Sequence, residues 1–251
     1  MIYLKSNADI AIMRENGKIL IEIFEKLKEI IKAGITTKDI DTVVENIIYS
    51  HSAVPSFKGY RGFPAAACVS LNAEVLHGIP HSGNVLREGD IVSADVGVFK
   101  NGFHVDAART FAVGMITEDT RHLVDVARGS FFKGAAQAVI GNRVSDISAA
   151  IQQHVEAAGL NVIRDMVGHG IGRSLHEEPS VPNFGPPGKG AKLRSGTVLA
   201  VETMICQGDF RIVTKSDGWT AVTKDGKLSA HYEDTLAVTG DGPAILTLAE
   251  N

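Results

Sequence analysis

Residues 86–96 read LREGDIVSADV, and residues 193–203 read LRSGTVLAVET. The two stretches align without a gap from a shared Leu-Arg-x-Gly start, and the alignment places Asp95 on Glu202. In both stretches the carboxylate stands inside an apolar, β-branched run of the kind found in strands. One strand pattern that occurs twice, each time with an acidic residue inside it, indicates a duplicated structural unit.

Further matches extend this repeat in both directions. They keep the same order in both parts of the chain: G-x-x-x-x-D-I at 34–40 and 141–147, L-H-x-x-P at 76–80 and 175–179, and a carboxylate that opens a strand-like run at Asp106 and Glu233. The sequence therefore predicts an α+β protein with a single domain over residues 1–251. Its two pseudo-symmetric helix–helix–strand halves, roughly 1–115 and 116–251, would share one central sheet.

The expected helices and strands follow from two kinds of periodicity. Apolar residues three and four apart predict helices at about 10–31, 36–48, 117–139 and 144–158. Thr36 or Thr37 is the expected cap of the second helix and Ser145 that of the fourth. Runs of β-branched residues predict strands at 67–71, 90–99, 104–114, 197–206, 210–215, 219–224 and 231–240. KNG at 100–102 predicts a tight hairpin turn, and PNFGPPGKG at 182–190 an exposed loop.

Composition excludes several classes of protein. The 251 residues are 44% apolar and 22% charged, which is enough to form a core. The net charge of −4, with no cluster of Lys and Arg, argues against a nucleic-acid-binding surface. No signal peptide or membrane-spanning run is apparent, so we expect a cytoplasmic protein. Cys68 and Cys206 are too few for a disulfide framework and are expected in the core.

Four carboxylates stand where burial is expected. They are Asp95 and Asp106 in the first half, and Glu202 and Glu233 in the second. Asp95 and Asp106 flank the predicted hairpin turn, so they should face the same side of adjacent strands. An ionised carboxylate in an apolar environment is costly unless it is paired, hydrogen-bonded or bound to a metal. Because four converging carboxylates also repel one another, a cation between them is the simplest remedy.

One histidine completes a candidate metal centre. His169 has no counterpart in the first half, where Ser70 stands at the equivalent spacing. One imidazole, four carboxylates and no thiolate suit a pair of divalent ions such as Mn²⁺, Fe²⁺, Co²⁺ or Zn²⁺. The structural alternative is that the carboxylates cap turns or pair with Arg109 or Arg211, and that His77 and His176 are core residues. The remaining histidines are expected to be ordinary surface or local residues: His51, His81, His104, His122, His154 and His231.

The motifs together resemble the type I methionine aminopeptidases over essentially the whole chain. The segments that carry the resemblance are NAEVLHGIP, DIVSADVGVFKNGFHVDAARTF, GHGIGRSLHEEP, LAVETM and AHYEDTLAVT. The length resembles the compact bacterial form of this M24 metallopeptidase family. The resemblance implies the pita-bread fold, in which two pseudo-symmetric halves surround a curved, mainly antiparallel sheet.

The resemblance also implies a role for each site residue. The metal ligands would be Asp95, Asp106, His169, Glu202 and Glu233, with Asp106 and Glu233 bridging the two ions. Glu202 would act as general base on a metal-activated water, His176 would stabilise the oxyanion, and His77 would contact the scissile amide nitrogen. An additional monovalent cation is a further expectation. Glu177 and Glu178, beside His176, would be the least important polar residues of that segment.

The family's methionine pocket maps onto a small group of residues. They are Tyr60, Phe63, Cys68 and Trp219, with Phe57 at the edge and His77 and His176 beside the reacting bond. Bulky apolar walls suit an unbranched thioether. Thr203, Ala73 and Leu175 depart from residues common in relatives, which affects the expected pocket shape and leaves the ligand set complete.

The predicted function is therefore removal of the N-terminal methionine from nascent chains and peptides with a small second residue. A proline-specific aminopeptidase or dipeptidase of the same fold, or a non-catalytic peptide-binding relative, is the alternative. The expected partners are nascent polypeptide N-termini, with transient ribosome association, no membrane, and a monomeric state by resemblance.

Overall fold

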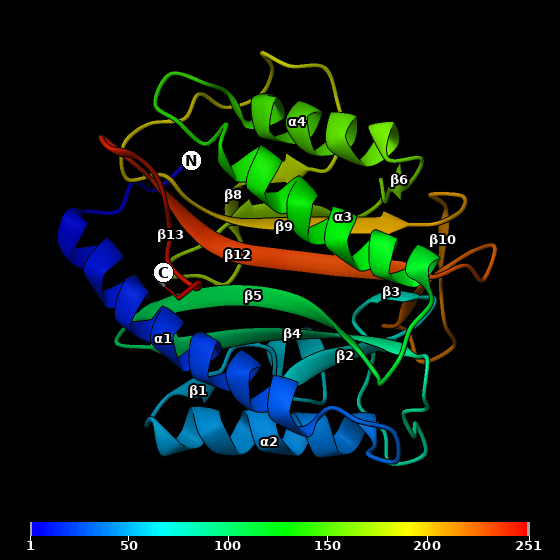
Figure 1. The fold of residues 1–251 in the computed structure, drawn as a ribbon. Coiled ribbons are helices and arrows are strands. Elements are labelled where there is room, and N and C mark those ends of the chain that lie inside the picture. Colours follow the sequence, from blue (N-terminus) through cyan, green and yellow to red (C-terminus); the bar gives the residue numbers. More distant parts are fainter. Residues whose placement is uncertain (1, 250–251) are drawn as a thin grey trace.

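A ten-stranded, antiparallel sheet forms the centre of the computed structural model, which describes residues 2–249 (Figure 1). Its main path runs in the order β1 (Val54–Pro55), β4 (Ile91–Lys100), β5 (Phe103–Ala112), β12 (Ser229–Thr239), β9 (Val198–Cys206), β7 (Val167–Gly170) and β8 (Glu177–Pro182). Three strands pair outside this path: β2 (Ala67–Leu71) with β4, β6 (Asn161–Val162) with β9, and β13 (Gly242–Ile245) with β12. A small second sheet has the order β10 (Ile212–Thr214), β11 (Ala221–Thr223) and β3 (Glu74–Leu76).

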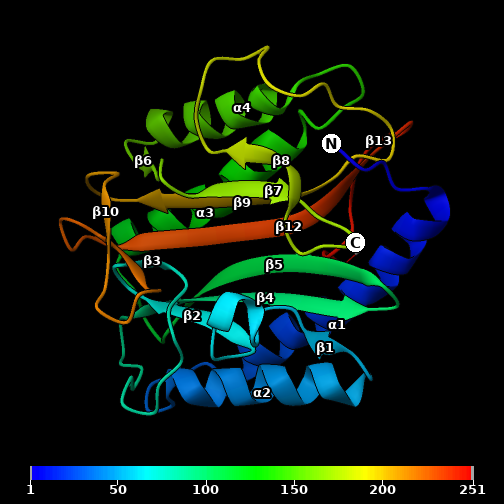
Figure 2. The ribbon, with the colours of Figure 1, turned by 180° about the vertical axis from the view of Figure 1, so that it is seen from behind.

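Four α-helices in the described residues accompany the sheet: α1 (Asn7–Ile30), α2 (Thr37–Ser50), α3 (Glu118–Ala135) and α4 (Val144–Ala157). A short 3-10 helix, Tyr60–Gly62, lies between β1 and β2. In Figure 1, α1 and α3 pass in front of the central strands, α1 on β4 and β5, and α3 on β9 and β12. The reverse view leaves β5 and β12 uncovered by helices (Figure 2). This confirms the expected α+β class and the order of helices and strands along the chain. No helix in the described part of the chain is both long and apolar enough to span a membrane.

Helix caps agree with the sequence in α2 and differ in α4. The Thr36 hydroxyl accepts a hydrogen bond from the Asp39 amide, as predicted for a capping residue. The prediction of Ser145 as the cap of α4 is wrong, because the helix begins at Val144 and Arg143 occupies the cap position. The Ser145 hydroxyl instead accepts from the Lys189 amide at 2.6 Å and fixes the 182–190 loop.

The central strands bring four site positions into one row. The β4–β5 hairpin turns at Asn101 and Gly102, both with positive φ, as the KNG pattern predicts. Its register places Asp95 opposite Ala108. Ala108 is opposite Glu233 on β12, and Glu233 is opposite Glu202 on β9. Residues in register on adjacent strands point to the same face. The row Asp95, Ala108, Glu233 and Glu202 therefore crosses four adjacent strands on one face of the sheet.

This register corrects one part of the sequence repeat. In the sequence, Asp106 corresponds to Glu233, because each carboxylate opens a strand-like run. The two halves place Asp95 and Glu202 at matching positions on the outer strands of the row, β4 and β9. Ala108 and Glu233 match on the inner strands, β5 and β12. Two residues before these inner positions stand Asp106 and His231, so His231 is the counterpart of Asp106.

Two threonine hydroxyls hold these equivalent positions in the same way. The Thr235 Oγ1 accepts from the Asp106 amide at 2.9 Å and donates to the Asp106 carbonyl at 2.8 Å. The Thr110 Oγ1 accepts from the His231 amide at 2.9 Å and donates to the His231 carbonyl at 2.9 Å. Backbone pairing between β5 and β12 is limited to two residue pairs. The hydroxyls therefore satisfy buried backbone groups on either side of that short ladder.

Candidate metal centre

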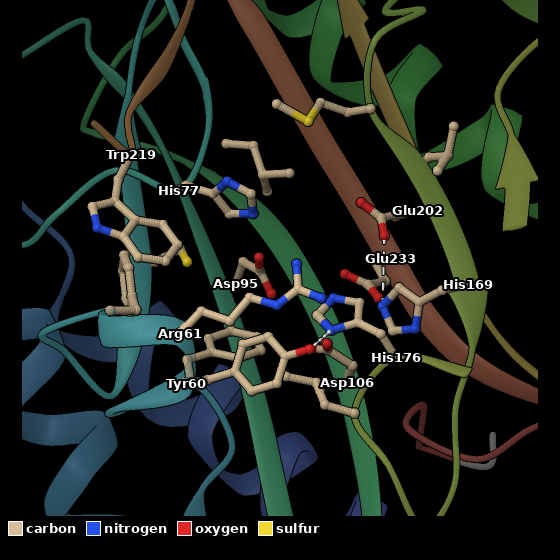
Figure 3. Close-up of a pocket in the computed structure, with 17 residues that line it drawn as sticks. Tyr60, Arg61, His77, Asp95, Asp106, His169, His176, Glu202, Trp219 and Glu233 are labelled. Atoms are coloured by element: carbon tan, nitrogen blue, oxygen red, sulfur yellow. Dashed lines mark hydrogen bonds and ion pairs between the residues drawn. The ribbon is translucent and has the colours of Figure 1, made fainter. Parts of the chain in front are cut away.

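A cavity of about 190 Å³ opens on the face of the sheet that carries the row (Figure 3). Every predicted site residue lines it, together with several residues that the sequence analysis did not single out as part of the site. The lining is Phe57, Tyr60, Arg61, Phe63, Cys68, Leu76, His77, Asp95, Asp106, Met166, Val167, His169, Leu175, His176, Glu202, Trp219 and Glu233. The fold thus gathers the predicted ligands, the two histidines and the apolar wall in one place.

The four carboxylates are buried, and three of them have an oxygen without a hydrogen-bond partner among the described residues. Asp95, Asp106, Glu202 and Glu233 are 2–7% exposed. Among the described residues, one oxygen each of Asp95, Asp106 and Glu233 has no hydrogen-bond partner. Burial raises the pKa of Asp106 to about 7. Burial and the neighbouring Asp106 carboxyl raise the pKa values of Asp95, Glu202 and Glu233 well above their ordinary range.

Neither arginine named in the structural alternative pairs with these four carboxylates. Arg109 pairs with Asp234 at 2.7 Å on the helix-covered face of the sheet, since residues 109 and 234 alternate with the cavity-facing positions. Arg211 pairs with Asp209 at the surface. Neither arginine therefore neutralises the carboxylates in the cavity, and the orphaned oxygens fit a site that is completed by a cation.

His169 is held in the form that can ligate a metal. Glycines flank it on both sides. A side chain at position 168 would clash with the Ala200 carbonyl oxygen, and one at position 170 with the Glu178 carbonyl oxygen. The His169 Nδ1 lies 2.8 Å from the Gly170 carbonyl oxygen and donates to it. Burial lowers the pKa of His169 to about 4, so the ring is neutral. Its Nε2 lone pair is then free to face the carboxylates, 3.8 Å from Glu202 Oε1.

The potential ligand atoms form two groups that share one residue. Asp106, His169 and Glu233 place one ligand atom each within 4.8 Å of one another. Asp95, His231 and Glu233 form a second group by the same measure. His231 is 1% exposed, which corrects its prediction as an ordinary surface or local residue. The signal was present in the sequence, because aligning FAVG at 111–114 with LAVT at 236–239 places Asp106 on His231.

Two further histidines border the carboxylates from the open side. The ring centroids of His176 and His169 are 4.3 Å apart, and the His176 Nδ1 lies 2.8 Å from the Tyr60 hydroxyl. Partial burial, with the neighbouring His169 and Arg61, lowers the pKa of His176 to about 4. Burial also lowers the pKa of His77. Both rings are therefore neutral near pH 7, and each can donate a hydrogen bond from one ring nitrogen and accept one at the other.

The apolar wall stands at the other end of the cavity. Phe63 packs edge-on against Trp219 with ring centroids 5.2 Å apart, and Trp219 is 6.2 Å from the His77 ring. Cys68 is buried beside them on β2, directly opposite Asp95 on β4. Arg61, which the sequence analysis missed, reaches over the cavity near His176 (Figure 3). The cavity is thus apolar at one end and acidic at the other.

The three departures from common family residues lie at different distances from this cavity. The Thr203 hydroxyl donates to the carbonyls of Ala127 and Tyr232, on the face opposite Glu202. Ala73 is outside the lining. Leu175 lines the cavity and is 3% exposed. Only Leu175 can therefore affect the pocket by direct contact.

Comparison with known proteins places the chain in a family. Residues 11–240 match the model of metallopeptidase family M24. The methionine aminopeptidase of Clostridium perfringens is 56% identical over 99% of both chains. Methionine aminopeptidase 1 of Bacillus subtilis is 48% identical over 98% of this chain and 99% of its own. The chain therefore belongs to metallopeptidase family M24 and, within it, to the methionine aminopeptidases.

Solved structures agree with this assignment. The crystal structure of methionine aminopeptidase from Thermotoga maritima has a TM-score of 0.97 at 45% identity and covers 99% of this chain and 100% of its own. The prolidase of Pyrococcus furiosus has a TM-score of 0.80 at 19% identity, with 99% of this chain and 66% of that chain covered. The second likeness shows a shared fold alone, which confirms the pita-bread architecture expected from the sequence.

Proposed function

We propose that this chain is a metal-dependent methionine aminopeptidase that removes the N-terminal methionine of proteins and peptides with a small second residue. The observation that carries the proposal is the meeting, in one cavity, of a buried carboxylate–histidine cluster with an apolar pocket. The full-length relatives named methionine aminopeptidase support it. A proline-specific peptidase is disfavoured, because the proline-specific relatives share the fold at about 20% identity.

Five side chains would hold two divalent ions. Asp95, Asp106, His169, Glu202 and Glu233 supply oxygen and imidazole donors, which suit Mn²⁺, Fe²⁺, Co²⁺ or Zn²⁺. The unpartnered oxygens of Asp95, Asp106 and Glu233 and the free Nε2 lone pair of His169 are the features that fit such ions. When bound, the ions would polarise the scissile carbonyl and lower the pKa of a water at the site. A separate monovalent cation belongs to the proposal by resemblance.

Binding of the substrate would use both ends of the cavity. The methionine side chain is apolar, unbranched and polarizable, and it would lie against Phe63, Cys68 and Trp219, with Phe57 at the edge. Its free α-amine would lie toward the acidic end. The carboxylates at that end would attract the positively charged α-amine and so favour a peptide bound by its N-terminus. The activity is therefore that of an exopeptidase.

Proton transfer and charge stabilisation would fall to the residues around the scissile bond. Glu202, whose raised pKa favours proton uptake, would take a proton from the attacking water and pass it to the leaving amine. The Tyr60 hydroxyl would donate to His176 Nδ1 and so place the ring proton on Nε2, on the other side of the ring. His176 would then donate to the oxyanion, and His77 would contact the amide nitrogen of the scissile bond.

The whole chain would act as one domain, because the ligands come from both of the halves expected from the sequence. We place the enzyme in the cytoplasm as a monomer, with nascent N-termini as partners and transient contact with the ribosome. The reason for this proposal is that unprocessed N-terminal methionine is found on nascent chains.

Metal-depleted protein tests the proposal directly. It should release methionine from Met-Ala-Ser and leave Met-Lys-Ser nearly intact after one of the four ions is restored. The Asp95→Asn variant should lose both metal and activity, whereas His122→Gln on the surface of α3 should retain both. Absence of methionine release from Met-Ala-Ser with every ion would overturn the proposed function.

A further inference from the structure

His231 is a buried imidazole that the proposed five-ligand set does not use. It is 1% exposed, and among the described residues neither ring nitrogen has a hydrogen-bond partner. Burying a polar group without a partner costs about 1–3 kcal/mol. A neutral imidazole presents one donor and one lone pair, so the site needs something that accepts or binds there.

Two carboxylates of the metal centre, those of Asp95 and Glu233, lie close to the His231 ring. Its Nε2 lies 3.6 Å from Glu233 Oε2, which is longer than a hydrogen bond of about 2.7–3.2 Å. Two ligand atoms about 2.1 Å from a tetrahedral zinc ion are separated by about 3.4 Å. The observed separation therefore fits two ligands of one ion better than a direct contact between the two side chains.

We propose that His231 is a metal ligand, so that the ion held by Asp95 and Glu233 also binds an imidazole. The ligand atoms of Asp95, His231 and Glu233 lie within 4.8 Å of one another, as do those of Asp106, His169 and Glu233. Each ion of the proposed pair would then lie beside one imidazole, His169 or His231, with Glu233 common to both groups of ligand atoms. This inference rests on the proposed dinuclear centre and adds a sixth ligand to it.

The backbone holds His231 as firmly as it holds a proposed ligand. The strand register makes His231 the counterpart of Asp106, and Thr110 fixes the backbone of His231 as Thr235 fixes that of Asp106. Both side chains start from inner strands and point to the cavity-side face of the sheet. A ligand on an anchored strand needs little reorganisation when an ion binds.

An imidazole at the second ion changes the cations that this site prefers. Carboxylate-only sites suit Mg²⁺ and Mn²⁺, whereas imidazole favours Zn²⁺, Co²⁺, Ni²⁺ and Fe²⁺. With an imidazole on each side, neither ion would be held by oxygen alone. We therefore expect tight binding of a second equivalent of Zn²⁺ or Co²⁺, and weaker binding of Mn²⁺ at the same position.

X-ray absorption and calorimetry of the whole protein test this assignment. Wild-type protein with two equivalents of Zn²⁺ should show an average of one imidazole per zinc, and His231→Gln an average of one half. By calorimetry, His231→Gln should weaken the second equivalent by at least about tenfold, the lower range for loss of an ordering group around a metal. His169→Gln should remove the other imidazole, and His122→Gln on α3 should change neither measurement.

The wild-type imidazole count does not depend on whether a variant folds. A count of one half in the wild type, or an unchanged second equivalent in folded His231→Gln, would overturn the role of His231 and leave the five-ligand centre intact. Failure of the wild type to bind any divalent ion would instead overturn the dinuclear centre and this inference together.

Discussion

The ammonium group of Lys5 lies 2.6 Å from Glu177 Oε2, and the two side chains are only 5% and 7% exposed. Lys5 is also fixed by its amide, which donates to the Gly196 carbonyl. Glu177 directly follows His176 and accepts from the Ser174 amide with its other oxygen. The buried ion pair therefore ties the segment that carries His176 to the start of the chain. Glu177, expected to be among the least important residues there, has a structural role.

Replacing Lys5 by Met should be strongly destabilising. The change leaves the Glu177 carboxylate buried without its counter-ion, which costs about 3–5 kcal/mol. Urea unfolding would measure this loss. The double variant Lys5→Met/Glu177→Met should recover most of it, because no unpaired charge remains. Equal stability of Lys5→Met and wild type would show that water, rather than Lys5, satisfies Glu177.

Glu202→Gln should lower kcat by about 10²–10⁴-fold, the range for loss of a general base. Gln keeps a side-chain oxygen that can bind a metal, but it cannot take up a proton. Glu178→Gln is the matched control, because Glu178 is exposed and outside the cavity lining. Methionine release and metal content should be measured on the same samples. Full activity in Glu202→Gln with both ions present would remove Glu202 from the proton-transfer step.

Tyr60→Phe should lower kcat roughly tenfold, about the effect of one lost charge-ordering hydrogen bond. Without the hydroxyl, His176 loses the hydrogen bond that would place its ring proton on the nitrogen facing the substrate. The phenyl ring retains the packing against His176, so KM for Met-Ala-Ser should change little. A rise in KM at constant kcat would instead make Tyr60 a residue of the methionine pocket only.

The stability of metal-free protein should depend on the protonation of Asp106. Burial raises its pKa from an ordinary 3.8 to about 7, so the folded state binds a proton that the unfolded state has lost. The contribution of such a group to stability falls as the pH rises from about 4 to 7 and is constant above. Wild type should therefore lose stability relative to Asp106→Asn over that range, as measured by urea unfolding with a chelator. A saturating divalent ion should abolish the difference in slope, since the cation stabilises the ionised carboxyl.

Thr235→Val should cost about 1–3 kcal/mol for each buried backbone group of Asp106 that it leaves unsatisfied. Val has nearly the shape of Thr and lacks only the hydroxyl. Thr235→Ser keeps the hydroxyl and should be much less destabilising. If the two variants unfold at the same denaturant concentration, the lost methyl group, and not the hydroxyl, accounts for the change.

The metal centre was predictable largely because strands have a simple period. The duplicated strand identified Asp95 and Glu202, and the KNG turn placed Asp106 beside Asp95. The same period explains why the sequence pattern did not identify His231 as part of the site. A shift of two residues leaves a side chain on the same face of a strand, so matching Asp106 with Glu233 violated no alternation rule.

Other features depend on contacts that leave no local pattern. Lys5 and Glu177 are 172 residues apart, and no periodicity connects them. Arg61 reaches the cavity from the turn Tyr60–Gly62, in which its own φ is 50°. Such positions are set by tertiary packing around the turn rather than by the propensity of the residues in it.

The narrow β5–β12 ladder has a consequence for how the protein holds together. Asp95 and Asp106 come from strands before the ladder, whereas His169, Glu202 and Glu233 come from strands after it in the chain. Without a cation, the four carboxylates cannot all ionise without repelling one another across this ladder. With one, residues from both parts of the chain would bind a common ion, so loading with metal would add a non-covalent cross-link between those two parts.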